Sequence, residues 1–119
     1  MTANNYGNMT NKQLDKAVAE RVMGYVDRGI EYYIGERIDA TENWHFTTNI
    51  SQAFDVVEKM IADRWFVTIY GVTYDGDYGV DMFLERHNAC VVSIDTVYDK
   101  SLPRAICIAA LMAKESGSR

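Results

Sequence analysis

The sequence predicts an α+β fold, specifically an α/β/α sandwich in which three helices pack on a three- to four-stranded, mainly antiparallel sheet. Two observations lead to this prediction. Three stretches carry apolar residues at helical spacing, and three consecutive stretches are rich in aromatic and β-branched residues and are separated by short turns. Because helices and a sheet with apolar faces must each be covered, helices packed on the sheet are the economical arrangement.

Length and composition predict one domain. A chain of 119 residues can form one hydrophobic core, and 48% apolar and 24% charged residues are ordinary values for a globular domain. We expect this domain to span residues 10–115, with no internal repeat and no linker. Residues 1–9 are polar and rich in Asn, so we expect a flexible N-terminal tail there, and residues 116–119 are expected to fray.

The first helix is expected over residues 11–23. Thr10 and Gln13 have the spacing of a capping box, in which each side chain accepts a hydrogen bond from the other residue's backbone N–H. Gly24 offers a C-terminal stop because glycine readily adopts the left-handed conformation that ends many helices. A short strand is expected at residues 30–34, where apolar and other residues alternate, and the polar stretch 36–43 is expected to be a loop.

The second helix is expected over residues 50–63. Asn49 can accept a hydrogen bond from a free amide of the first turn, and Gln52 can reach back as in a capping box. We expect this segment to be a central core helix with one apolar face. The apolar face is predicted to consist of Ile50, Phe54, Val57 and Ile61 with Ala53 and Met60.

The second half of the chain predicts an antiparallel meander followed by a helix. Strands are expected at residues 65–72, 78–85 and 90–97 because these stretches are rich in β-branched and aromatic residues. An Asp-Gly dipeptide at residues 75–76 favours a tight hairpin turn between the first two strands. The last helix is expected to start at Ser101 or Leu102, with the only proline in its first turn, where its missing amide costs nothing. Its face of small residues can lie close on a sheet.

Three blocks of the chain resemble the phage ABA sandwich domain, a family of small proteins from phages and prophages. The blocks are residues 17–24, 46–60 and 102–113, and they lie in the right order. Tyr25 and Arg104 depart from the pattern, in which relatives tend to carry a Trp and a small residue. The resemblance implies an α/β/α layering and a phage-encoded accessory protein in the host cytoplasm. Its shared residues are mainly core and capping residues, so they indicate the fold rather than the function.

Two helix starts predict a site for a small anion. The free amides of a helix's first turn and the helix dipole both favour negative charge. Trp44, His45 and Thr48 precede the second helix, and the two rings could stack on a base while Thr48 donates a hydrogen bond. Lys100 and Arg104 lie at the start of the last helix, where they could neutralise a phosphate. These five residues are the candidate ligand-binding residues.

The alternative for the same residues is purely structural. Thr48 then only helps to cap the second helix, and Trp44 only packs in the core. Arg104 stands at the unfavourable end of a helix dipole and needs an anionic partner, which in this interpretation is Asp99 or Glu115.

Metal and catalytic motifs are weak in this sequence. Asp75, Asp77 and Asp81 lack the glycine and the bidentate Glu of an EF-hand loop, and His87 and Cys90 form only half of a zinc motif. We find no nucleophile elbow, no phosphate-binding glycine-rich loop and no paired histidines on a helix. We therefore expect no cofactor, no metal site and no enzymatic activity. The two cysteines lie in apolar stretches and are expected to be reduced.

The family resemblance supplies the functional hypothesis, a counter-defence binding protein that sequesters a small anionic, nucleotide-derived immune signal of the host without catalysis. The alternative is a protein inhibitor that covers a host defence protein or nuclease with its acidic surface. A formal charge of −5 argues against binding to duplex nucleic acid. No apolar stretch is long enough to predict a membrane span. Eight tyrosines and an open sheet edge lead us to expect a homo-oligomer.

Overall fold

The computed structural model describes residues 6–27, 31–34, 37–40, 44–73, 75–86 and 89–117. His87, which with Cys90 has the spacing of half a zinc motif, lies outside these residues. In chain order the elements are α2 (Asn11–Ala17), the π-helical turn η1 (Val18–Val22), β1 (Val26–Asp27), β2 (Glu31–Ile34), β3 (Arg37–Ala40), α3 (Ile50–Ala62), β4 (Trp65–Tyr70), β5 (Tyr78–Arg86), β6 (Ala89–Ser93), β7 (Val97–Asp99) and α4 (Leu102–Gly117).

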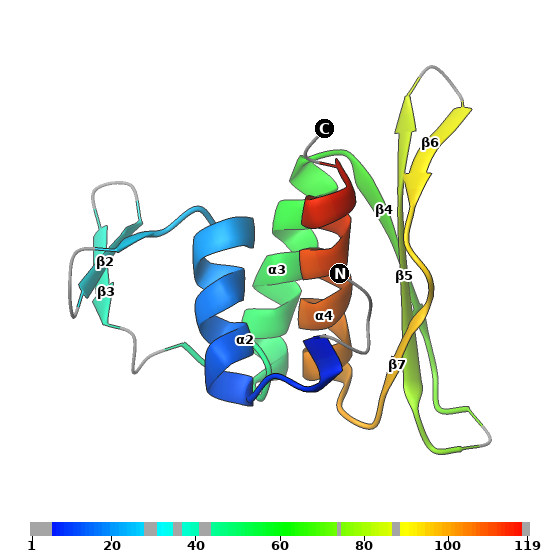
Figure 1. Cartoon of the computed structure of the whole chain (residues 1–119), viewed down its shortest axis with the longest axis horizontal. Coiled ribbons are helices and arrows are strands. Elements are labelled where there is room, and N and C mark those ends of the chain that lie inside the picture. Colours follow the sequence, from blue (N-terminus) through cyan, green and yellow to red (C-terminus); the bar gives the residue numbers. More distant parts are fainter. Residues whose placement is uncertain are drawn as a thin grey trace.

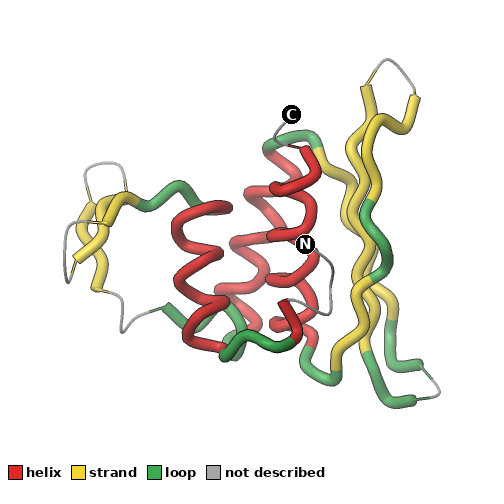
Figure 2. Tube along the Cα trace, viewed as in Figure 1, coloured by secondary structure: helices red, strands yellow, loops and turns green. Residues whose placement is uncertain are grey.

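The helices form a block between two sheets (Figure 1). The larger sheet contains β4, β5, β6 and β7, is antiparallel throughout, and packs on α4 and α3. Figure 2 shows that α2, α3 and α4 all lie on the same side of this sheet. The predicted α+β sandwich of three helices on a four-stranded antiparallel sheet is therefore confirmed. No described helix covers the opposite face of the sheet.

The long strand β5 organises the larger sheet. β4 pairs along one edge of β5, while β6 and β7 pair with its other edge one after the other. The single strand predicted at residues 90–97 is therefore two short strands, separated by residues 94–96. The Ile94 N–H still donates to the carbonyl oxygen of Met82 at 3.2 Å, so the chain stays close to β5 across the interruption.

Helix α4 contains the longest run of buried residues in the part of the chain whose burial the structure describes. It begins at Leu102 with Pro103 in its first turn, as predicted, and every residue from Ala105 to Ala113 is buried. Four alanines in this stretch let the helix approach its neighbours closely. α4 therefore supplies much of the core, and α3, which we expect to be a central core helix, contributes Ala53, Val56, Val57 and Met60 to the same core.

The start of α3 has the predicted cap with one change. Asn49 Oδ1 accepts from the Gln52 N–H at 3.1 Å, which confirms the N-cap. Gln52 does not complete the predicted reciprocal bond to Asn49; its Oε1 accepts from the His45 N–H at 2.7 Å. The side chain therefore fixes the turn that enters the helix.

The buried face of α3 is rotated from the predicted one. Ile50, Phe54 and Ile61 were expected to be buried, but they are 45%, 43% and 56% exposed. Residues spaced by three and four positions around Val56 face α4 and the sheet instead. The buried residues of α3 are Ala53, Val56, Val57 and Met60.

A second, small sheet lies on the far side of the helices from the larger one (Figure 1). The strand predicted at residues 30–34 is present as β2 and pairs antiparallel with both β1 and β3. The loop prediction for residues 36–43 is wrong where β3 forms, at residues 37–40. The polar sequence of β3 carries little strand propensity, so pairing with the adjacent β2 decides its conformation.

The first helix is capped and stopped as predicted. Thr10 and Gln13 form the reciprocal capping box, with hydrogen bonds of 2.8 and 3.1 Å. Gly24 has φ 77°, which ends the helical segment in the left-handed conformation. The helix changes from α to π geometry over η1 before this stop.

The expected flexible tail does not include residues 6–9, the part of 1–9 that the structure describes. Tyr6 is 1% exposed, and its hydroxyl donates to Glu115 Oε2 at 2.6 Å. The Met9 N–H donates to the carbonyl oxygen of Tyr6 at 3.0 Å. The buried ring of Tyr6 thus helps to anchor this segment against α4.

Candidate functional site

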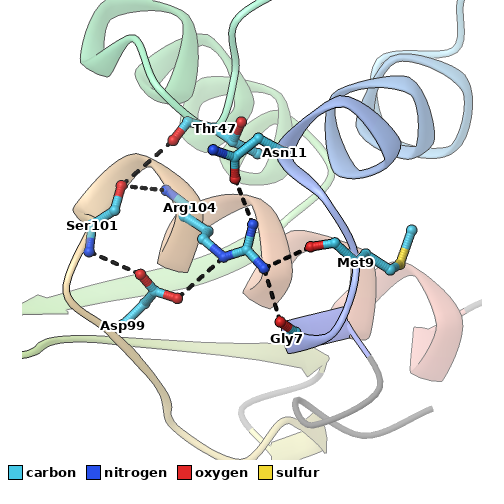
Figure 3. A network of polar contacts seen from close by, with 7 residues as sticks. All are labelled: Gly7, Met9, Asn11, Thr47, Asp99, Ser101 and Arg104. Atoms are coloured by element: carbon cyan, nitrogen blue, oxygen red, sulfur yellow. Dashed lines mark hydrogen bonds and ion pairs between the residues drawn. The ribbon is translucent and has the colours of Figure 1, made fainter.

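Two of the predicted site segments meet where the helices begin. The Ser101 hydroxyl, just before α4, donates to the carbonyl oxygen of Thr47, just before α3, at 3.4 Å. Arg104 of α4 donates through Nη1 to Asn11 Oδ1 at the first residue of α2 (Figure 3). The starts of three helices are therefore adjacent, and their combined dipoles favour negative charge at this end of the molecule.

Arg104 is the centre of a polar network at this end (Figure 3). Its Nη2 donates to the carbonyl oxygens of Gly7 and Met9 at 3.0 and 2.9 Å, and its Nε lies 3.3 Å from Asp99 Oδ2. The ion pair with Asp99 confirms the structural alternative considered for Arg104. With 17% of its side chain exposed, Arg104 ties the N-terminal segment to the start of α4.

Two carboxylates already occupy positions that favour an anion. Asp99 accepts from the Ser101 N–H at 2.8 Å, immediately before α4. Asp15 of α2 accepts from both the N–H and the hydroxyl of Thr47 at 2.9 Å, and Thr47 lies three residues before the start of α3. Internal anions thus supply much of the negative charge that the helix starts favour.

The remaining predicted site residues divide by exposure. Trp44 is 5% exposed and packs against Tyr25, with ring centroids 5.6 Å apart, so its ring lies in the core. His45, Thr48 and Lys100 are exposed. Thr48 follows Thr47 and Lys100 precedes Ser101, and Thr47 and Ser101 are hydrogen-bonded to each other. The structure therefore brings Thr48 and Lys100 to the same end of the molecule as Arg104.

A different surface is the more prominent exposed feature of the described residues. It is the side of the larger sheet that faces away from the helices, which we call the open face. Along β4 and β5 the side chains alternate, so that Trp65 and Met82 point into the core while their neighbours point outward. The open face consists of Phe66, Thr68, Tyr70, Gly79, Asp81, Phe83, Glu85 and Tyr98.

Aromatic side chains dominate the open face. Phe66 and Phe83 are directly opposite each other on β4 and β5, and their rings stack with centroids 4.8 Å apart and planes 5° apart. A Cβ built on Gly79 would lie 3.1 Å from Tyr98 Cε1 and 3.2 Å from Tyr70 Cδ2, so both tyrosine rings cover this glycine. Phe66, Tyr70 and Tyr98 remain 52%, 46% and 58% exposed.

Asp81 lies between these two aromatic pairs. Its Oδ2 accepts from the Tyr70 hydroxyl at 2.8 Å, and its Oδ1 accepts from the Thr96 hydroxyl. The hydrogen bond to the carboxylate raises the pKa of the Tyr70 phenol, because losing the proton would place two negative charges together. From the sequence, Asp81 could be a metal ligand or lie on the outer face of the strand predicted at residues 78–85, and the structure places it on that outer face. The alternation of residues along β4 and β5 is the signal that could have revealed the surface.

The described residues hold no grouping of three potential metal-ligating side chains. Asp81 is bound to Tyr70 and Thr96, and so contributes to the sheet surface. Cys107 is a free, buried cysteine of α4, and burial raises the pKa of its thiol. Its thiolate is therefore disfavoured. Within the same residues no helix is both long and apolar enough to cross a membrane.

The fold is that of a small α+β sandwich domain whose exposed surfaces are a polar cluster of helix starts and an aromatic sheet face. The chain belongs to the phage ABA sandwich domain family, whose model matches residues 16–111. The match covers η1, α3 and both sheets, together with the end of α2 and the first part of α4. No curated protein matches the chain, and no solved structure matches it.

Proposed function

We propose that this phage protein acts by binding without catalysis, and that its target is a basic surface of a host protein. The observation that carries the proposal is the open face, where exposed aromatic rings lie beside the partly exposed carboxylates of Asp81 and Glu85. Aromatic residues contribute a large share of the energy at protein interfaces. The formal charge of −5 would attract a basic partner and speed its association.

The class of target is a host defence protein or nuclease. Defence proteins and nucleases that act on nucleic acid need basic surfaces, because they neutralise phosphates with Lys and Arg. An acidic phage protein that covers such a surface would block access of the nucleic acid. This mode of action needs no catalytic group.

The test is affinity capture from host cells with an active defence system, using matched surface variants. Phe66→Ala removes an exposed ring from the open face, and Phe54→Ala removes a similarly exposed ring from α3. We expect capture of one stoichiometric host protein that weakens at high salt and is lost with Phe66→Ala but kept with Phe54→Ala. Equal capture by both variants would exclude the open face as the binding surface.

Sequestration of an anionic nucleotide signal is the second candidate function. The adjoining helix starts and the exposed His45, Thr48 and Lys100 favour it. It requires the ligand to compete with Asp15 and Asp99, which already accept hydrogen bonds there. We place it second for that reason.

Native mass spectrometry separates the two candidates. For sequestration, protein purified from host cells with an activated nucleotide-signalling defence should carry a small molecule that is released unaltered on denaturation. The double variant His45→Ala with Lys100→Ala should lose that molecule, whereas Phe66→Ala should retain it. A mass without bound ligand, although the signal is present, would exclude sequestration and leave protein binding as the remaining candidate.

A further inference from the structure

The open face places one carboxylate at the centre of an aromatic surface. On β5, Phe83 and Gly79 lie two residues to either side of Asp81, a spacing of roughly 7 Å along a strand. The stacked Phe66 ring lies opposite Phe83, and the two tyrosine rings lie over Gly79. A side chain that binds Asp81 would therefore have an aromatic pair on each side.

The carboxylate of Asp81 is held in one orientation before any partner binds. Tyr70 and Thr96 each donate to a different oxygen of Asp81. A carboxylate has about four acceptor positions, so one position on each oxygen remains available. Two parallel donors on a planar group would match this arrangement, and the fixed orientation reduces the entropy lost on binding.

No cation of the described residues pairs with Asp81 in the structure. Strands β4, β6 and β7 contain no Lys or Arg, and β5 contains only Arg86, at its last position. Glu85 adds a second carboxylate to the same face. The charge on this face is therefore negative, which favours a positively charged partner.

Charge also decides between the possible occupants of the open face. A second copy of the chain would bring Asp81 and Glu85 towards the same carboxylates of its partner, which is unfavourable. Nucleic acid and anionic lipid would be repelled in the same way. A basic protein segment is the occupant that fits both the aromatic and the acidic character of the surface.

Arginine fits the site better than lysine. Its guanidinium is planar, carries parallel donors that match a carboxylate, and stacks on aromatic rings. A lysine ammonium is a strongly hydrated point charge that makes no such parallel pair. We infer that Asp81 is the anchor for an arginine side chain of the partner protein, which pairs with the carboxylate and packs between the Phe66–Phe83 and Tyr70–Tyr98 pairs. This inference rests on the proposed function.

The test uses the full chain and three short peptides that differ at one position. The probes are acetylated, amidated Leu-Xaa-Leu peptides in which Xaa is arginine, lysine or citrulline, which keeps the planar shape of arginine but lacks its charge. Titration is followed by the backbone NMR signals of the isotope-labelled protein. We expect the arginine peptide to shift the signals of Gly79, Asp81 and Phe66, with affinity falling from arginine to lysine to citrulline.

Variants assign the effect to the anchor. Asp81→Asn keeps an acceptor for Tyr70 or Thr96 but removes the charge, and we expect it to weaken binding of the arginine peptide about tenfold. Asp55→Asn, which neutralises an exposed carboxylate of α3, should leave binding unchanged. Tyr70→Phe removes one orienting hydrogen bond and should weaken binding less than Asp81→Asn does. Circular dichroism checks that each variant is folded.

The outcomes separate this inference from the proposed function. Equal binding of arginine and citrulline peptides, shifts on another surface, or no shifts would overturn the arginine anchor. If Phe66→Ala abolishes capture of the host protein while Asp81→Asn does not, the proposed function stands and the anchor fails. A dimer that Phe66→Ala dissociates would assign the open face to a second copy and overturn the anchor as well.

Discussion

Asp15 of α2 accepts two hydrogen bonds from Thr47, one from the backbone N–H and one from the side-chain hydroxyl, both at 2.9 Å. The two residues are 8% and 1% exposed. The pair joins α2 to the segment just before α3, and the small sheet β1–β3 lies between them in the sequence. The pair therefore holds together the two ends of the chain segment that contains the small sheet.

Removing the acceptor at Asp15 should destabilise the protein. Asp15→Ala leaves a buried N–H and a buried hydroxyl without their acceptor, and we expect it to lower the free energy of unfolding by about 2–3 kcal/mol. Asp15→Asn is the matched control because its amide oxygen can accept both bonds, and it should cost less than about 1 kcal/mol. Urea unfolding at neutral pH measures both. An equal loss in the two variants would assign the stabilisation to the charge rather than to the acceptor.

The rotated face of α3 makes a prediction about core substitutions. Met60 is completely buried, so Met60→Ala should lower the free energy of unfolding by about 2–5 kcal/mol through lost burial and a cavity. Phe54 is the larger residue but is 43% exposed, so Phe54→Ala should cost about 1 kcal/mol or less. Chemical denaturation of both variants gives the comparison. A larger loss of unfolding free energy for Phe54→Ala than for Met60→Ala would support the apolar face predicted from the sequence.

Tyr6 predicts a loss of stability in alkaline solution. Burial and the hydrogen bond to Glu115 raise the pKa of Tyr6 from 10.0 to about 12. The folded protein therefore holds this proton more tightly than the unfolded chain does. The corresponding stabilisation is complete below pH 10 and is lost as the pH rises through about 12.

Substitution at Tyr6 isolates this contribution from those of other titrating groups. In Tyr6→Phe, the free energy of unfolding should fall less steeply with pH between pH 10 and 12 than in the unaltered protein. At neutral pH the variant should lose about 1 kcal/mol with the hydrogen bond. Tyr98→Phe, which removes a phenol from an exposed side chain, should keep the original slope. The same slope in all three proteins would contradict the assignment to Tyr6.

The sequence was informative where a local interaction decides the structure. The capping box of Thr10 and Gln13, the N-cap at Asn49 and the stop at Gly24 depend on neighbouring residues, and all three were predicted correctly. The hairpin joining β4 and β5 also follows from a local turn signal. These signals, with the family resemblance, were sufficient for the α+β class.

The features that the sequence did not predict depend on contacts between distant segments. α3 has apolar residues on more than one side, so periodicity alone could not tell that Val56 is buried and Ile61 exposed. The burial of Tyr6 depends on α4, about a hundred residues later. Arg104 was predicted as a ligand-binding residue from its place on a helix, but its contacts with Gly7, Met9 and Asp99 depend on tertiary structure.

Arg64 predicts a stabilising substitution at the end of α3. It follows the C-cap of the helix with φ 72°, a left-handed conformation that is unfavourable for residues with a Cβ. Arg64→Gly should therefore raise the free energy of unfolding by about 0.5–1 kcal/mol, measured by chemical denaturation. Gly24→Ala is the matched control: the glycine has φ 77° with open space around its Cβ position, so only backbone strain should act, and the protein should lose about 1 kcal/mol. Destabilisation by Arg64→Gly would mean that contacts of the arginine side chain outweigh its backbone strain.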